Sequence, residues 1–60
     1  MRNWEEKMAW GEKVASNWKT VTMEAYIIDA MFWAAAERDG MELDETDVYD
    51  MTEKVMDGEW

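Results

Sequence analysis

The chain contains no proline and only three glycines, at positions 11, 40 and 58. Proline and glycine are the residues that most disfavour helix interiors, so a chain this poor in them is suited to long helical segments. Gly40 and Gly58 each follow a helix-like run, which is where glycine commonly ends a helix. They divide the chain into segments 2–39 and 41–57. The first is too long for one helix in so small a domain, and we expect it to break at residues 19–22, where helix propensity is low.

The spacing of apolar residues predicts three helices in one domain, at about residues 3–19, 22–39 and 44–57. The first has an apolar stripe of Trp4, Met8, Gly11, Ala15 and Trp18. Its two small residues, Gly11 and Ala15, indicate close approach of another helix. The third begins with Asp44 as its N-cap. Its expected apolar face consists of Val48, Met51, Val55 and Met56.

The middle segment has almost no polar face. Eleven of the twelve residues in 25–36 are apolar, and a helix that is apolar all round is normally buried. Strand signals are weak, because no run alternates for long and β-branched residues are few. The predicted fold class is therefore all-α: a small three-helix bundle with a hydrophobic central second helix and an acidic third helix.

A domain of 60 residues buries only about 60% of the surface that its unfolded chain exposes, so it needs additional stabilisation. The chain has no cysteine and no histidine, which removes disulfides and the usual zinc ligands. Oligomerisation or heavy aromatic packing remains as a source of additional stability. The five tryptophans favour aromatic packing, since each large aromatic side chain can bury about 150–250 Å².

The same absences argue against several classes of function. Imidazole acid–base chemistry and thiol nucleophiles are missing, so we expect no enzymatic activity and no cofactor. The acidic residues do not match the spacing of a calcium-binding loop, so no metal site is expected. A net charge of −9 argues against direct binding to nucleic acid. The chain lacks a secretory signal and a transmembrane segment, which predicts a cytoplasmic protein.

The negative charge is concentrated near one end of the chain. Residues 1–38 hold six acidic and five basic side chains, whereas residues 39–60 hold nine acidic side chains and one basic one, Lys54. One interpretation is that these acids form the solvated face of an amphipathic helix, which also keeps the protein soluble. Solvent-exposed faces usually mix charges, however, because like charges three or four residues apart are destabilising. Charge repulsion that brings no folding benefit favours a functional role for these acidic side chains.

We therefore expect the third helix to bind a basic protein surface, in a groove that normally holds a nucleic acid backbone. The predicted partner-binding residues are Asp44, Glu45, Asp47, Asp50, Glu53 and Asp57. In size and charge the chain resembles phage-encoded inhibitors of host defence or transcription, including anti-CRISPR and anti-restriction proteins, some of which mimic DNA. The resemblance involves no specific motif. It implies an inhibitor that acts in the cytoplasm of a bacterial host.

The second helix offers another surface. Its core-facing side is predicted to consist of Ile27, Ala30, Met31 and Ala34. A dimer or second interface is then predicted at Tyr26, Asp29, Phe32 and Trp33. The alternative is that another helix covers these residues. If they are exposed, the simplest partner is a second copy of the chain, and the protein is a self-associating structural or regulatory module whose acidity only provides solubility.

Overall fold

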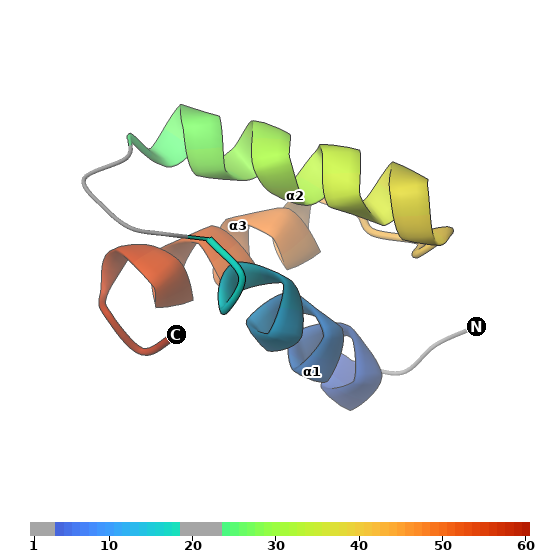
Figure 1. The fold of residues 1–60 in the computed structure, drawn as a ribbon, viewed down its shortest axis with the longest axis horizontal. Helices are drawn as coiled ribbons and strands as arrows, with labels where there is room; N and C mark the ends of the chain where they lie inside the picture. Colours follow the sequence, from blue (N-terminus) through green and yellow to red (C-terminus); the bar gives the residue numbers. More distant parts are fainter. Residues whose placement is uncertain (1–3, 19–23) are drawn as a thin grey trace.

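The computed structural model describes residues 4–18 and 24–60. Helix α1 spans Trp4–Ala15, α2 spans Ala25–Asp39 and α3 spans Glu45–Met56. The described stretches contain no strand, and the predicted all-α three-helix bundle is confirmed. Figure 1 shows α2 along the top of the molecule, α3 behind it and α1 below.

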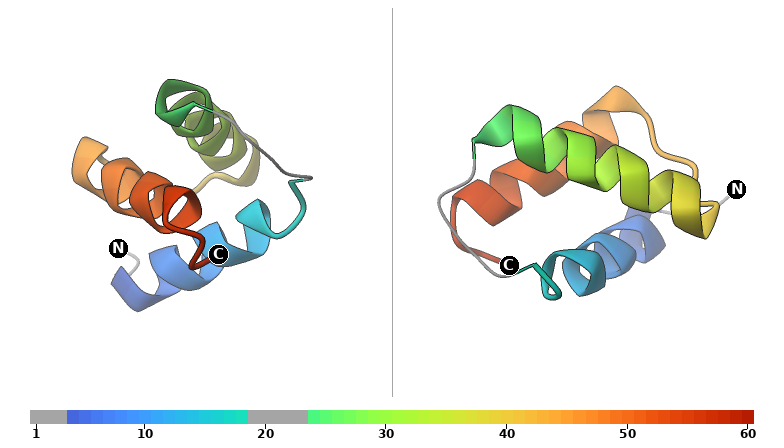
Figure 2. Two further views of the ribbon diagram at one scale, coloured as in Figure 1. Left: turned by 90° about the vertical axis from the view of Figure 1, so that its left-hand side faces the viewer. Right: turned by 45° about the horizontal axis from the view of Figure 1, so that its top comes forward.

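The turn between α2 and α3 is short, and α3 runs back along α2 in the opposite direction (Figure 1). α3 packs against both other helices, whereas the contact between α1 and α2 is the smallest of the three. The left view of Figure 2 shows the helices from one end, arranged around a common interior. The molecule measures 33 × 20 × 19 Å along its principal axes.

Local signals place the ends of α2 and α3 close to where the sequence predicts them. Gly40 ends α2 in the left-handed conformation, with φ of 70°, and the N–H groups of Gly40 and Met41 both donate to the carbonyl of Ala36. The side chain of Asp44 caps α3, and Gly58 follows that helix with φ of 79°. These positions confirm the predicted stop signals and the predicted N-cap.

α1 is shorter than expected. It ends at Ala15 rather than at residue 19. The Ser16 hydroxyl and the Asn17 amide donate to the carbonyl of Lys13, at 2.7 and 3.3 Å. Serine and asparagine side chains compete in this way with the helical hydrogen-bond pattern. The break expected at residues 19–22 lies outside the described residues.

The start of α2 also differs from the expected position. The start expected at residue 22 lies outside the described residues, and Glu24 has an extended backbone, with φ of −82° and ψ of 153°. The helix begins with Ala25.

Phe32 is the centre of the core and is completely buried. Its ring lies 4.7 Å from that of Trp18, 6.4 Å from that of Trp60 and 6.5 Å from that of Trp10, centroid to centroid. Such tilted and edge-on contacts are the favourable geometries for aromatic pairs. Aromatic side chains from α1, from α2, from the segment after α1 and from the C-terminal segment thus stabilise this small core. The other side chains with almost no exposure are Ile28 and Met51.

The small residue Gly11 allows side chains of the C-terminal half to approach α1. A methyl group at Gly11 would lie 2.9 Å from Sδ of Met51 and 3.0 Å from two ring atoms of Trp60. The sequence predicted close packing over this position. The neighbours are these two side chains.

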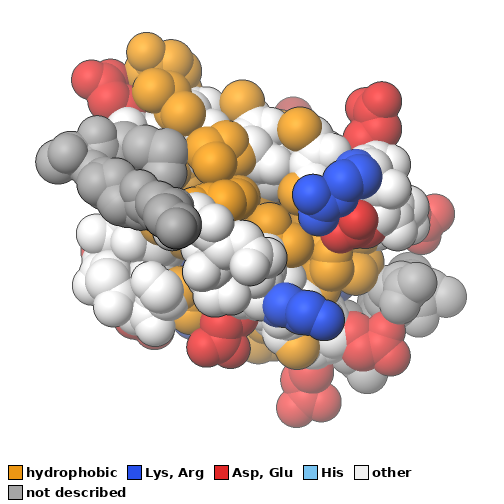
Figure 3. Space-filling view, viewed as in Figure 1, with side chains coloured by type: hydrophobic (Ala, Val, Ile, Leu, Met, Phe, Trp, Pro, Cys, Tyr) orange, Lys and Arg blue, Asp and Glu red, His pale blue; other side chains and the backbone are white. Residues whose placement is uncertain are grey.

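The orientation of α2 is not the predicted one. Its buried residues are Ile28, Phe32, Ala35 and Ala36, whereas Ile27, Ala30 and Ala34 are exposed and Met31 is half-buried. The expectation that an apolar helix is buried all round is also wrong here, because two short helices cover only one side. Figure 3 shows hydrophobic side chains along the surface over α2.

Two residues expected on the apolar stripes of the other helices are exposed. Trp4 at the start of α1 and Met56 at the end of α3 each expose 53% of their surface. Both occupy terminal turns, where no neighbouring helix covers them.

Candidate functional site

The acidic residues of α3 fall into two groups with different roles. Asp44 and Asp47 form a reciprocal cap: the Asp47 N–H donates to Oδ1 of Asp44 at 2.9 Å, and the Asp44 N–H donates to Oδ2 of Asp47 at 3.1 Å. The same Asp47 oxygen accepts a hydrogen bond from the Lys7 ammonium at 2.8 Å. Asp47 is only 6% exposed.

Asp47 was predicted to bind a partner, and its location corrects that prediction. Its carboxylate lies between α1 and α3, where it joins the two helices. Burial opposes ionisation of this group, but the bonds from Lys7 and from the backbone of Asp44 outweigh it and lower the pKa of Asp47. Asp44 remains exposed, although one of its oxygens is engaged in the cap.

The remaining predicted acids lie on the outward side of α3. Glu45, Glu53 and Asp57 are exposed, and Asp50 is half-buried. None of these four forms an ion pair with a described residue. The carboxylate of Glu53 accepts a hydrogen bond from the Tyr49 hydroxyl, which raises the pKa of Tyr49 above its ordinary value of 10.0.

Several basic side chains are held by other carboxylates. Lys54 in α3 lies 3.6 Å from Glu59. The Arg38 guanidinium donates to both oxygens of Asp39, at 2.8 and 3.1 Å, and the Trp10 indole donates to one of them at 2.9 Å. These bonds, that of Arg38 first, lower the pKa of Asp39 to about 2. The outward side of α3 is therefore negative without internal compensation among the described residues.

The second predicted surface is divided by the fold. Phe32 lies in the core and cannot contribute to an exposed interface, which corrects its assignment. Tyr26 and Trp33 are exposed by 69% and 41%. Asp29 is half-buried, and its carboxylate accepts a hydrogen bond from the hydroxyl of Thr52 in α3.

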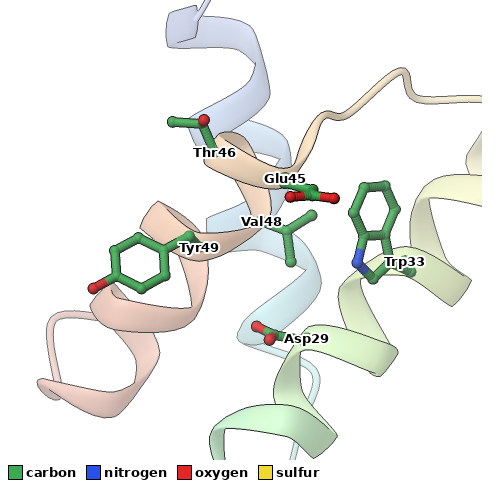
Figure 4. Close-up of a pocket in the computed structure, with 6 residues that line it drawn as sticks. All are labelled: Asp29, Trp33, Glu45, Thr46, Val48 and Tyr49. Carbon is green, nitrogen blue, oxygen red and sulfur yellow. The ribbon is translucent and has the colours of Figure 1, made fainter.

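A groove between α2 and α3 brings residues of the two predicted surfaces together. It has a volume of about 750 Å³ and is open to solvent. Figure 4 shows Val48 between the two helices, the Trp33 ring on one side with the Glu45 carboxylate beside it, and Asp29 at one end. The residues that line the groove are Asp29, Trp33, Glu45, Thr46, Val48 and Tyr49.

The sequence reasoning missed Tyr49 and Thr52. Tyr49 is 62% exposed and lies one helical turn from both Glu45 and Glu53, so the four-residue spacing was an available signal. Thr52 is buried and its contact with Asp29 crosses from α3 to α2. No local sequence signal identifies that contact.

No protein-family model matches the chain, and no curated protein or solved structure matches it significantly. In residues 4–18 and 24–60, no helix combines the length and apolar character needed to span a bilayer. The same residues contain no group of three or more carboxylates arranged to hold a metal ion.

Proposed function

We propose that the protein is a small acidic binding module that docks the outward side of α3 on a basic surface of a larger protein. The observation that carries this proposal is the absence of ion-pair partners, among the described residues, for Glu45, Asp50, Glu53 and Asp57. A basic partner would relieve their mutual repulsion on binding. We therefore assign the protein a binding role rather than a catalytic one.

The spacing of these acids supports a partner that normally binds an extended anion. Residues four apart on a helix are separated by about 6 Å along its axis, so the outward side carries a row of charges. Such a row would compete with a nucleic acid backbone for a basic site and would speed the encounter with it. We propose an inhibitor of this type, acting in the cytoplasm of a bacterial host.

Charge reversal on α3 tests the proposal. The first variant replaces Glu45, Asp50, Glu53 and Asp57 by lysine. A matched control reverses four exposed acids outside α3, and these are Glu5, Glu12, Glu24 and Glu37. The two variants have the same net charge, so a difference between them reports the position of the charges and not their number.

The measurement is capture of proteins from a bacterial lysate on the immobilised wild-type chain and both variants, at about 0.1 M and 1 M salt. We expect a basic protein to be retained at low salt by the wild type and the control, and lost with the α3 variant or at high salt, where the Debye length falls from about 10 Å to 3 Å. DNA should displace the retained protein. Equal retention by both variants contradicts the proposal.

A second candidate function is self-association through α2. It is favoured by the exposed apolar side chains of that helix, which include Tyr26, Ile27 and Trp33. Exposed aromatic residues are common in interfaces, and symmetric homodimers are the commonest soluble oligomers. In this case the acidity of α3 provides solubility only.

Sedimentation distinguishes the two candidates. A chain of 7.1 kDa that dimerises through α2 should sediment at twice that mass at hundreds of micromolar, and high salt should preserve or strengthen the dimer. Tyr26→Glu and Trp33→Glu should each return it to a folded monomer. A monomer at every concentration and salt level removes self-association from consideration.

A further inference from the structure

The groove between α2 and α3 combines an apolar floor with an aromatic side. Val48 is 3% exposed and lies between the helices, and the Trp33 ring stands beside it (Figure 4). Trp33 exposes 41% of its surface, and its indole N–H donates to no described residue. A flat or cationic group can stack on the face of a partly exposed indole ring.

Two carboxylates lie in the groove, those of Asp29 and Glu45. Glu45 has no hydrogen-bond or ion-pair partner among the described residues. Asp29 uses one oxygen, Oδ1, to accept the bond from Thr52, and its second oxygen has no partner in the described part of the chain. Figure 4 places Glu45 beside the Trp33 ring and Asp29 at the other end of the groove. None of the described residues that line the groove is basic.

We infer that this groove receives an arginine side chain projecting from the basic partner. The inference rests on the proposed function and identifies the part of the surface that recognises a single residue. The guanidinium stacks on Trp33 with the Glu45 carboxylate as its acceptor, the aliphatic stem packs on Val48, and Asp29 adds negative charge at the other end of the groove. Aromatic stacking and the two oxygens of a carboxylate both suit a planar guanidinium with its fixed fork of donors.

Arginine fits these features better than lysine does. A lysine ammonium is a compact, strongly hydrated charge without a planar face, so it gains less from the indole ring and cannot bind two acceptors in one plane. An anionic ligand is disfavoured by the two carboxylates of the groove.

Nuclear magnetic resonance gives a direct test, because the indole N–H groups of the five tryptophans report separately. The ¹⁵N-labelled protein is titrated with an acetylated and amidated pentapeptide that has one central arginine between glycine and serine residues. Matched peptides carry lysine or the uncharged isostere citrulline at that position. Trp33→Phe assigns the Trp33 indole signal, and the exposed Trp4 is the internal control.

We expect the arginine peptide to shift the Trp33 indole and the amides of Glu45 and Tyr49, and to leave the Trp4 indole in place. The lysine peptide should bind severalfold more weakly, and citrulline should have no effect. Glu45→Gln should weaken arginine binding about threefold to tenfold, whereas Glu12→Gln, in α1 and outside the groove, should not.

Four results overturn the inference. Three of them are equal shifts of the Trp4 and Trp33 indoles, equal effects of arginine and citrulline, and equal effects of Glu45→Gln and Glu12→Gln. A Trp33 signal that moves with protein concentration alone also overturns it, because the groove is then occupied by a second copy. If the groove fails these tests while reversal of the α3 acids still abolishes capture of a basic protein, the proposed function stands without this recognition site.

Discussion

The ammonium of Lys7 in α1 lies 2.8 Å from the carboxylate of Asp47 in the first turn of α3. Both side chains are largely buried, with 17% and 8% of their surfaces exposed. The same carboxylate completes the cap of α3 by accepting from the Asp44 N–H. One acidic residue in this highly acidic segment therefore has a structural role, and its neighbours on α3 can be tested for binding without it.

Asp47→Ala should lower the free energy of unfolding by about 1–3 kcal/mol, because it removes a helix cap and leaves the Lys7 ammonium without its acceptor. Urea unfolding followed by circular dichroism measures the change. Asp50→Ala is the matched control: Asp50 lies one turn further along α3 and has no bonded partner among the described residues. Its effect should stay within about 0.5 kcal/mol. Equal losses for the two variants would contradict the structural role of Asp47.

Acid should destabilise the fold through the carboxylates with lowered pKa values. The bonds from Arg38 and Trp10 lower the pKa of Asp39 from its ordinary 3.8 to about 2. A carboxyl group whose pKa is lower in the folded state stabilises the protein above its unfolded pKa, and this contribution is lost as the pH falls through the folded pKa. The loss from Asp39 should therefore occur between about pH 4 and pH 2.

Urea unfolding across pH 7 to 2 measures this dependence. Protonation of the other acids relieves their repulsion and acts in the opposite direction, so the comparison is with Asp39→Asn. The difference in unfolding free energy between wild type and variant should shrink as the pH falls below 4. A difference that is constant with pH would show that the ionisation of Asp39 does not stabilise the fold.

Local chemistry in the sequence was sufficient to predict where α2 ends and where α3 begins and ends. Asp44 caps α3, and Gly40 and Gly58 follow α2 and α3 in the left-handed conformation, as their residue types favour. Asp47 also carried a local signal, since it lies three residues after the cap, at the position of a capping box. Its pairing with Lys7 is a contact between helices and has no such signal.

The orientation of α2 required the folded structure. Nearly every residue in 25–36 is apolar, so hydrophobic periodicity did not distinguish Ile27, which is exposed, from Ile28, which is buried. The side of α2 that is buried is the one on which Phe32 packs against three tryptophan rings. The groove was unpredictable for the same reason, because it forms only when Asp29 and Trp33 are placed opposite α3.

Adjacent residues of α2 should respond very differently to substitution. Phe32→Ala removes the completely buried centre of the core and should cost about 3–5 kcal/mol, enough to unfold a domain of this size. Trp33→Ala removes a half-exposed ring and should leave the helical signal at 222 nm and a cooperative thermal transition in place. Similar losses for both variants would contradict the orientation of α2.

Gly11→Ala should destabilise the protein, although alanine favours a helix over glycine by about 1 kcal/mol. The new methyl group would lie 2.9 Å from Sδ of Met51, which is completely buried, and 3.0 Å from the Trp60 ring. Overpacking a core typically costs about 1–3 kcal/mol, so we expect a net loss of about 1 kcal/mol.

The measurement is chemical unfolding of Gly11→Ala, of Trp60→Leu and of the double variant. Since a smaller side chain at position 60 removes part of the crowding, the double variant should lose less than the two single losses added together. Strict additivity, or a Gly11→Ala variant more stable than the wild type, would show that α1 and the Trp60 side chain are not in close contact.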